Sequence, residues 1–148
     1  MKVGVFIISY ILCTTEKQSV GEALAEVVGA NRKCDGYMEG NGYCVTWAMG
    51  HLVGLIEPEE YGYISQEDMW KSENGKSVAL GQLPLIPSQF RLRILPDKIK
   101  VKQFNVMKSL MNSADCRYII DAGDAGEAGH ILQAFIRWMA RCKKPVKR

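Results

Sequence analysis

The same unit is predicted near both ends of the chain: an apolar run, then a polar turn, then an amphipathic helix. The apolar runs cover residues 3–13 and 116–120, and both contain β-branched and aromatic side chains. Runs of this composition are typical of strands that are buried on both faces of a sheet. Repeated strand–turn–helix units indicate an α/β fold with a mainly parallel sheet of about four strands flanked by helices.

The sequence predicts three helices. Ser19 and Glu22 have the spacing of a capping box after the polar break at residues 14–18, and Gly29 is suited to end that helix. Residues 100–112 carry an apolar stripe at helical spacing. The last helix is predicted from a similar stripe, which consists of Ile131, Leu132, Phe135, Ile136 and Met139.

The region between these units shows only short or weak structural signals. Glycines divide residues 31–50, and we expect a strand or hairpin there from residues 37–38 and 43–47. Residues 90–95 alternate between apolar and basic side chains, which predicts a half-exposed strand. Residues 51–80 are only weakly patterned.

Length and composition restrict the class of protein. A chain of 148 residues suits one compact domain, and we expect it to cover residues 1–148. Within it, residues 1–11 form an extended first strand or N-terminal extension, and residues 141–148 form a basic tail. The 47% hydrophobic and 24% charged residues exclude disordered and low-complexity classes. A net charge of +3 is too small to identify a nucleic-acid partner by itself.

The number and spacing of the cysteines indicate the redox environment of the protein. There are five, they are widely scattered, and none has a partner at CxxC spacing. This pattern argues against a disulfide framework or a structural zinc site, so we expect a reducing, cytoplasmic setting. The apolar start could also be a short leader with Cys13 as a lipidated residue. However, no small residue precedes Cys13, and the run is too short to span a membrane, so a buried strand is preferred.

Acidic residues follow both predicted end strands. Glu16 comes after the first, and Asp121 and Asp124 follow the last in a glycine-rich turn. Ligands of open α/β sheets collect at the carboxyl ends of the strands, so neighbouring strands would bring these carboxylates together. Hard oxygen ligands with room for water describe a Mg²⁺ site. The alternative is that Asp121 and Asp124 merely cap the last helix.

Several motifs, met in order along the chain, resemble the N-terminal Toprim domain of type IA topoisomerases, and most closely that of bacterial topoisomerase III. The resemblance extends over almost the whole chain from Leu12 onward. It rests on EKxSV at residues 16–20, DGYxxGNGYxVTWAxGHL at 35–52, LPLIP at 83–87, residues 119–129, and CKKPVKR at 142–148.

The resemblance implies a single Rossmann-like Toprim domain and a function on DNA. In this family, Glu16 would assist the proton transfers of strand cleavage and rejoining, and Lys17 would steady the phosphate. Glu16 and Asp124 would hold Mg²⁺. The nucleophilic tyrosine of these enzymes lies in a later domain, to which the 142–148 motif leads. We therefore expect this chain to be an N-terminal fragment or a truncated member that does not relax DNA alone.

The segment at residues 124–130 departs from the family pattern. Ala128 stands where a glutamate ligand is usual, His130 where a second glutamate is usual, and Glu127 where arginine is usual. A register three residues earlier starts at Asp121 and ends at Glu127, but it also lacks the glutamate ligand. Mg²⁺ is therefore expected to bind weakly, mainly when DNA phosphate completes its shell.

The expected partner is DNA, and single-stranded DNA in particular. Lys17, His51, Arg91 and Arg93 are the candidate DNA contacts, because cationic side chains meet phosphates and His51 lies within the long motif. If this is a fragment, the remaining topoisomerase domains are partners too. Two alternatives stay open: a non-catalytic nucleic-acid-binding module with a degenerate metal site, and a small Toprim nuclease or primase-like protein.

Overall fold

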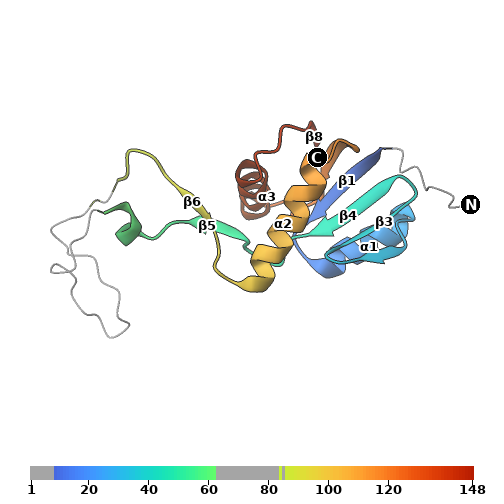
Figure 1. Ribbon diagram of the computed structural model, residues 1–148, viewed down its shortest axis with the longest axis horizontal. Helices are drawn as coiled ribbons and strands as arrows, with labels where there is room; N and C mark the ends of the chain where they lie inside the picture. The colour runs from blue at the N-terminus through green and yellow to red at the C-terminus, as the bar shows by residue number, and fades with distance from the viewer. Residues whose placement is uncertain (1–8, 63–83, 85) are drawn as a thin grey trace, which may run out of the picture. The chain divides into compact units, whose positions relative to one another are not determined.

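The computed structural model describes residues 9–62, 84 and 86–148 and divides the chain into two compact units (Figure 1). The first unit consists of Met1–Gly54 and Ile94–Arg148, and the second of Leu55–Arg93. Part of the first predicted strand, residues 3–8, and part of the LPLIP motif lie outside the described residues. The expectation of one domain over residues 1–148 stays a prediction.

A six-stranded sheet forms the centre of the first unit, in the order β2-β3-β4-β1-β7-β8 (Figure 1). Strands β4, β1, β7 and β8 pair in parallel, whereas β2 and β3 add an antiparallel edge beside β4. The expected α/β class with a mainly parallel sheet is confirmed. The strands are β1 Tyr10–Thr15, β2 Arg32–Cys34, β3 Tyr37–Gly40, β4 Tyr43–Trp47, β7 Cys116–Asp121 and β8 Val146–Lys147.

Helices cover both faces of this sheet (Figure 1). They are α1 Gln18–Val28, α2 Lys98–Asn112 and α3 Glu127–Met139. Adjacent residues of β4 show the two faces: Val45 packs with Ala25 of α1, while the Thr46 hydroxyl accepts a hydrogen bond from Gln103 of α2. Because successive side chains of a strand point to opposite faces, α1 and α2 cover opposite faces of the sheet.

The first strand differs from its prediction at its end. Thr14 and Thr15 were expected in a polar break, but both belong to β1 and are fully buried. Their β-branched side chains suit a strand, and β1 is flanked on both sides, with Thr14 opposite Asp121 and Thr15 opposite Trp47. Backbone pairing on two sides therefore outweighs the polarity of the threonine hydroxyls.

The predicted capping box of α1 is wrong. The helix begins at Gln18 with Lys17 as an extended N-cap, and no side chain caps it. Since β1 continues to Thr15, only Glu16 and Lys17 separate strand from helix, and Ser19 lies within the first turn. The predicted end is confirmed: Gly29 has φ of 77°, in the left-handed region, and its N–H meets the carbonyls of the last turn.

The remaining elements are short. Strands β5 Val53–Leu55 and β6 Leu92–Ile94 pair as a two-stranded sheet, and a 3-10 helix covers Pro58–Tyr61. The strand expected at residues 90–95 is thus confirmed over its middle. The hairpin expected from residues 37–38 and 43–47 is confirmed by the antiparallel pairing of β3 with β4. Strands β2, β5 and β8 were not predicted. Within the part of the chain that the structure describes, no helix combines the length and apolar character that a membrane span requires.

A buried glutamine joins α2 to the sheet, and its replacement should destabilise the fold. Gln103 is 5% exposed, and its Nε2 lies 2.9 Å from the Gly36 carbonyl, 3.2 Å from Thr46 Oγ1 and 2.7 Å from the Trp47 carbonyl. We expect Gln103→Leu to lower the free energy of unfolding by roughly 2–3 kcal/mol, because buried acceptors lose their donor. Urea denaturation measures this. Asn105→Ala, at an exposed site of the same helix, is the control, and an equal loss there would contradict the prediction.

Candidate metal and nucleic-acid site

The two acidic segments leave the sheet from neighbouring strands. Strands β1 and β7 pair in parallel, with Leu12 opposite Ile119. Glu16 directly follows β1, and residues 122–126, which we call the acidic turn, follow β7. Parallel strands present their carboxyl ends at one edge of a sheet, which is where ligands bind in open α/β folds. The adjacency on which the predicted site depends is therefore present, while the meeting of the Glu16 and Asp124 carboxylates stays a prediction.

Lys17 links the two segments. Its Nζ lies 3.5 Å from Oδ2 of Asp124, and both side chains are more than half exposed. An exposed ion pair of this kind contributes little to stability. Its importance is positional, because it brings a cation and a carboxylate from sites 107 residues apart to the same strand ends.

Asp121 is held inside the protein, unlike Asp124. Its side chain is 2% exposed, and Oδ2 accepts a 2.9 Å hydrogen bond from Nη1 of Arg137. Oδ1 accepts another from the N–H of Gly123, at 3.1 Å. This carboxylate is engaged by neighbouring groups, which favours Asp124 over Asp121 as the exposed candidate ligand.

The alternative in which Asp121 and Asp124 cap the last helix is wrong. The N-cap of α3 is Gly126, and no side chain makes the capping hydrogen bond. The acidic turn instead packs against the helix through its backbone: a Cβ placed on Gly129 would lie 2.5 Å from the Asp124 carbonyl oxygen. This close approach requires glycine at position 129.

The basic tail also contacts this region. Arg148 donates through Nη2 to the Asp124 carbonyl at 2.8 Å, and its Nη1 lies 2.7 Å from Nδ1 of His130. Part of the tail forms the exposed strand β8, and Lys147 lies 4.4 Å from the centre of the Tyr118 ring. Two cations, Lys17 and Arg148, therefore contact Asp124, one at its side chain and the other at its carbonyl.

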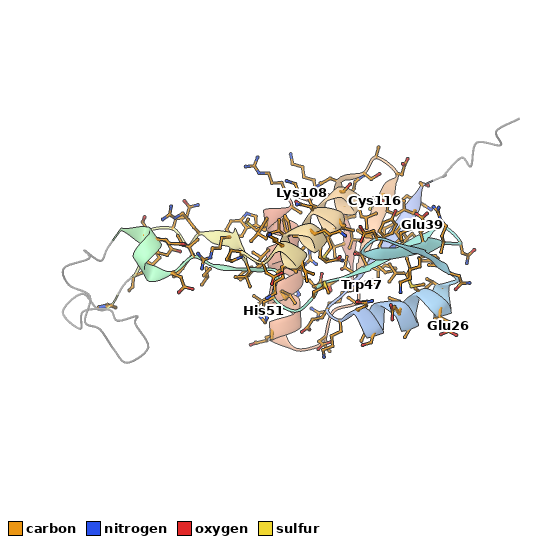
Figure 2. All side chains as sticks on the ribbon, turned by 60° about the horizontal axis from the view of Figure 1, so that its bottom comes forward. Glu26, Glu39, Trp47, His51, Lys108 and Cys116 are labelled. Carbon is orange, nitrogen blue, oxygen red and sulfur yellow. The ribbon has the colours of Figure 1, made fainter. Side chains whose placement is uncertain are left out.

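The other candidate DNA contacts belong to different compact units, His51 to the first and Arg91 and Arg93 to the second. His51 is exposed in the segment after β4 (Figure 2). Arg91 and Arg93 belong to the second unit, where Arg93 forms ion pairs with Glu57 and Glu60. Arg91 donates to the Glu60 carbonyl at 2.8 Å. The DNA-binding role of these three residues stays a prediction.

The donor set suits only a loosely held cation. Among the described residues, no group of three or more histidine, cysteine, aspartate or glutamate side chains is arranged to hold a metal. Glu16 is half-buried and Asp124 exposed, so a hydrated ion can reach both residues, and at Asp124 it would meet the Lys17 Nζ that lies 3.5 Å from Oδ2. Mg²⁺ keeps several waters and uses one or two carboxylates together with phosphates, and these residues fit that kind of binding.

Sequence reasoning missed two residues that lie beneath the site. Gln133 and Arg137 of α3 reach the ends of β1 and β7, where Gln133 Nε2 donates to the Thr15 carbonyl at 3.2 Å. Both sit beside the apolar stripe of the helix. A polar residue at a buried helical position is the signal that could have found them.

The structure thus places acidic and basic residues after adjacent parallel strands of an α/β sheet, and comparison with known proteins shows which proteins the chain is similar to. No family model matches the chain. It is 41% identical over 133 residues to DNA topoisomerase 3 of Shouchella clausii and to that of Bacillus subtilis. The figure for Bacillus licheniformis is 40%. The predicted resemblance to topoisomerase III is thereby confirmed.

The aligned region is most of this chain and a small part of each relative. It includes 90% of the chain and 17% of the DNA topoisomerase 3 proteins of Shouchella clausii and Bacillus subtilis. The similarity therefore does not by itself establish that this chain has the activity of those whole proteins.

The contact between α3 and the acidic turn gives a stability test. We expect Gly129→Ala to cost about 1–3 kcal/mol, because the new methyl group overlaps the Asp124 carbonyl. Gly126→Ser is the matched control: a Cβ there meets nothing within 4 Å, and serine is favoured at an N-cap. Thermal unfolding of both variants checks this, and equal midpoints would show that the turn does not pack on α3 as described.

Proposed function

We propose that the chain is the Toprim portion of a topoisomerase III-like protein, and that it binds DNA at the carboxyl ends of β1 and β7. The observation that supports this most strongly is the 41% identity over 133 residues to DNA topoisomerase 3. Within the whole protein, the proposed reaction is the breaking and rejoining of single DNA strands.

The roles of the site residues follow from their places. Glu16 is half-buried beside the strand ends and would give and take the proton of the reacting oxygen. Lys17 would attract the DNA phosphate, as an exposed cation does. Glu16 and Asp124 would hold Mg²⁺, which when bound supplies positive charge that orders the DNA backbone.

The isolated chain is proposed to be inactive in relaxation. In the family that it resembles, the nucleophilic tyrosine lies in a later domain. Tyr10 of this chain is a poor nucleophile, because burial raises the pKa of its hydroxyl to about 12 and the hydroxyl donates to the Leu110 carbonyl. Loss of supercoils caused by the purified chain with Mg²⁺, and abolished by Glu16→Ala, would contradict this part of the proposal.

A second candidate is a non-catalytic nucleic-acid-binding module. Two observations favour it. Ala128 provides no carboxylate in the first turn of α3, and the nearby His130 side chain is already in contact with Arg148. Both candidates bind DNA, and they differ in whether Mg²⁺ strengthens that binding.

Binding of single-stranded DNA tests the role of Lys17. We expect Lys17→Ala to weaken binding of a labelled oligothymidylate several-fold and to reduce the slope of log K against log salt by about 0.7, which is one phosphate contact. Fluorescence anisotropy over a range of salt concentrations measures both. Lys108→Ala removes an exposed lysine of α2 and serves as the control (Figure 2). If the two variants behave alike, the strand-end site is not where DNA binds.

Restoring the missing carboxylate tests the metal proposal. Ala128→Glu adds a hard oxygen ligand at the first turn of α3, so 10 mM Mg²⁺ should stabilise this variant more than the parent. A millimolar Kd corresponds to about 1.4 kcal/mol, or a rise of about 3–6 °C in the melting midpoint. Ala128→Gln is the control of equal size without charge. An equal Mg²⁺ gain in the parent would mean that other groups hold the ion.

A further inference from the structure

Two polar residues of α3, the buried Gln133 and the partly buried Arg137, reach the two strand ends that carry the candidate site. Gln133 Nε2 donates to the carbonyl of Thr15, the residue before Glu16. Arg137 Nη1 donates to Asp121, which ends β7 and precedes the acidic turn. The two residues are four positions apart and so lie on one side of the helix. A single helical face therefore contacts both segments from which Glu16 and Asp124 project.

The Gln133 amide makes few of the hydrogen bonds that could stabilise the fold. The side chain is fully buried, and its Oε1 has no hydrogen-bond partner among the described residues. Its single bond goes to the Thr15 carbonyl, which already accepts from the Ala48 N–H at 2.8 Å. Gln103, by comparison, serves three acceptors from one nitrogen. A buried amide with an unpaired oxygen is costly, so stability alone does not account for glutamine at this position.

The contacts of Arg137 shape the acidic turn. Asp121 receives Arg137 on one oxygen and the Gly123 N–H on the other. Gly123 also lies close to the side chains of Gln133 and Asp121. A Cβ built on it would be 3.0 Å from Cγ of Gln133 and 3.1 Å from Oδ1 of Asp121. The start of the turn is therefore enclosed by residues that α3 holds in place.

We propose that Gln133 and Arg137 are positioning residues, which set the separation between Glu16 and Asp124 and thereby the gap that receives a hydrated cation and a DNA phosphate. The inference rests on the proposed function. Neither residue acts on the ligand directly. Gln133 acts through the end of β1 and through Gly123 of the turn, which its Cγ borders, and Arg137 acts through Asp121.

Gln133→Leu is the informative variant, and Gln103→Leu its matched control. Leucine is similar in size to glutamine and removes the unpaired oxygen, so the melting midpoint should stay unchanged or rise. In the control the midpoint should fall. Arg137→Met would leave Asp121 buried without its partner and is expected to fold poorly, so the test does not depend on it.

Amide hydrogen exchange measures the positioning without reference to function. In Gln133→Leu, exchange at Ala122 and Gly123 should rise about tenfold relative to Leu12 of β1. In Gln103→Leu any rise should be the same at all three amides, because it reflects global stability. An unselective change in Gln133→Leu, or a fall in its melting midpoint like that of the control, would overturn the proposal.

Binding of oligothymidylate with and without Mg²⁺ measures the consequence. The gain in affinity that Mg²⁺ gives the parent chain should shrink at least fivefold in Gln133→Leu and persist in Gln103→Leu. A full gain in Gln133→Leu would overturn the positioning role. If the parent shows no gain at all, the proposed metal function is overturned instead, and hydrogen exchange alone then decides whether Gln133 positions the turn.

Discussion

Parallel pairing of β1 with β7 is the constraint on which the candidate site depends. The pairing joins residues more than 100 positions apart and brings Glu16 and the acidic turn to one edge of the sheet. The lateral position of the two segments then follows from the spacing of neighbouring strands, about 4.8 Å. What remains to be fixed is how each segment leaves its strand, and this depends on α3: Gly129 admits the turn, and Gln133 and Arg137 contact both strand ends.

Elements with strong local signals could be predicted from the sequence. The α2 and α3 stripes, the left-handed Gly29 and the strand before the acidic turn are confirmed because each depends on residues close together in the chain. Thr14 and Thr15 were assigned to a turn because their burial results from pairing with two distant strands. The two-residue β8 carries no periodicity, and its formation depends on pairing with β7, so it could not be predicted.

The site shows the same division. Glu16 and Asp124 could be proposed from sequence because each follows an apolar run, and Lys17 comes with Glu16. The burial of Asp121 could not be predicted from sequence, because its partner Arg137 lies on a helix that turns back over the strand. Likewise, Gln133 binds a backbone carbonyl 118 residues away, and no side-chain pattern records such a contact. Sequence therefore indicated which carboxylates are available, and tertiary contacts decide which one stays exposed.

The connection between Lys17 and Asp124 also bears on the order of folding. Their contact spans 107 residues, so the segment that holds Glu16 and Lys17 is made long before its counterpart. During synthesis, β1 can pair with β4 but has an open edge until β7 emerges, and open central edges invite association with other chains. Closing so long a loop slows folding. The acidic turn is thus assembled after the β1 segment, and a nascent chain gains this site only when β7 and α3 have been added.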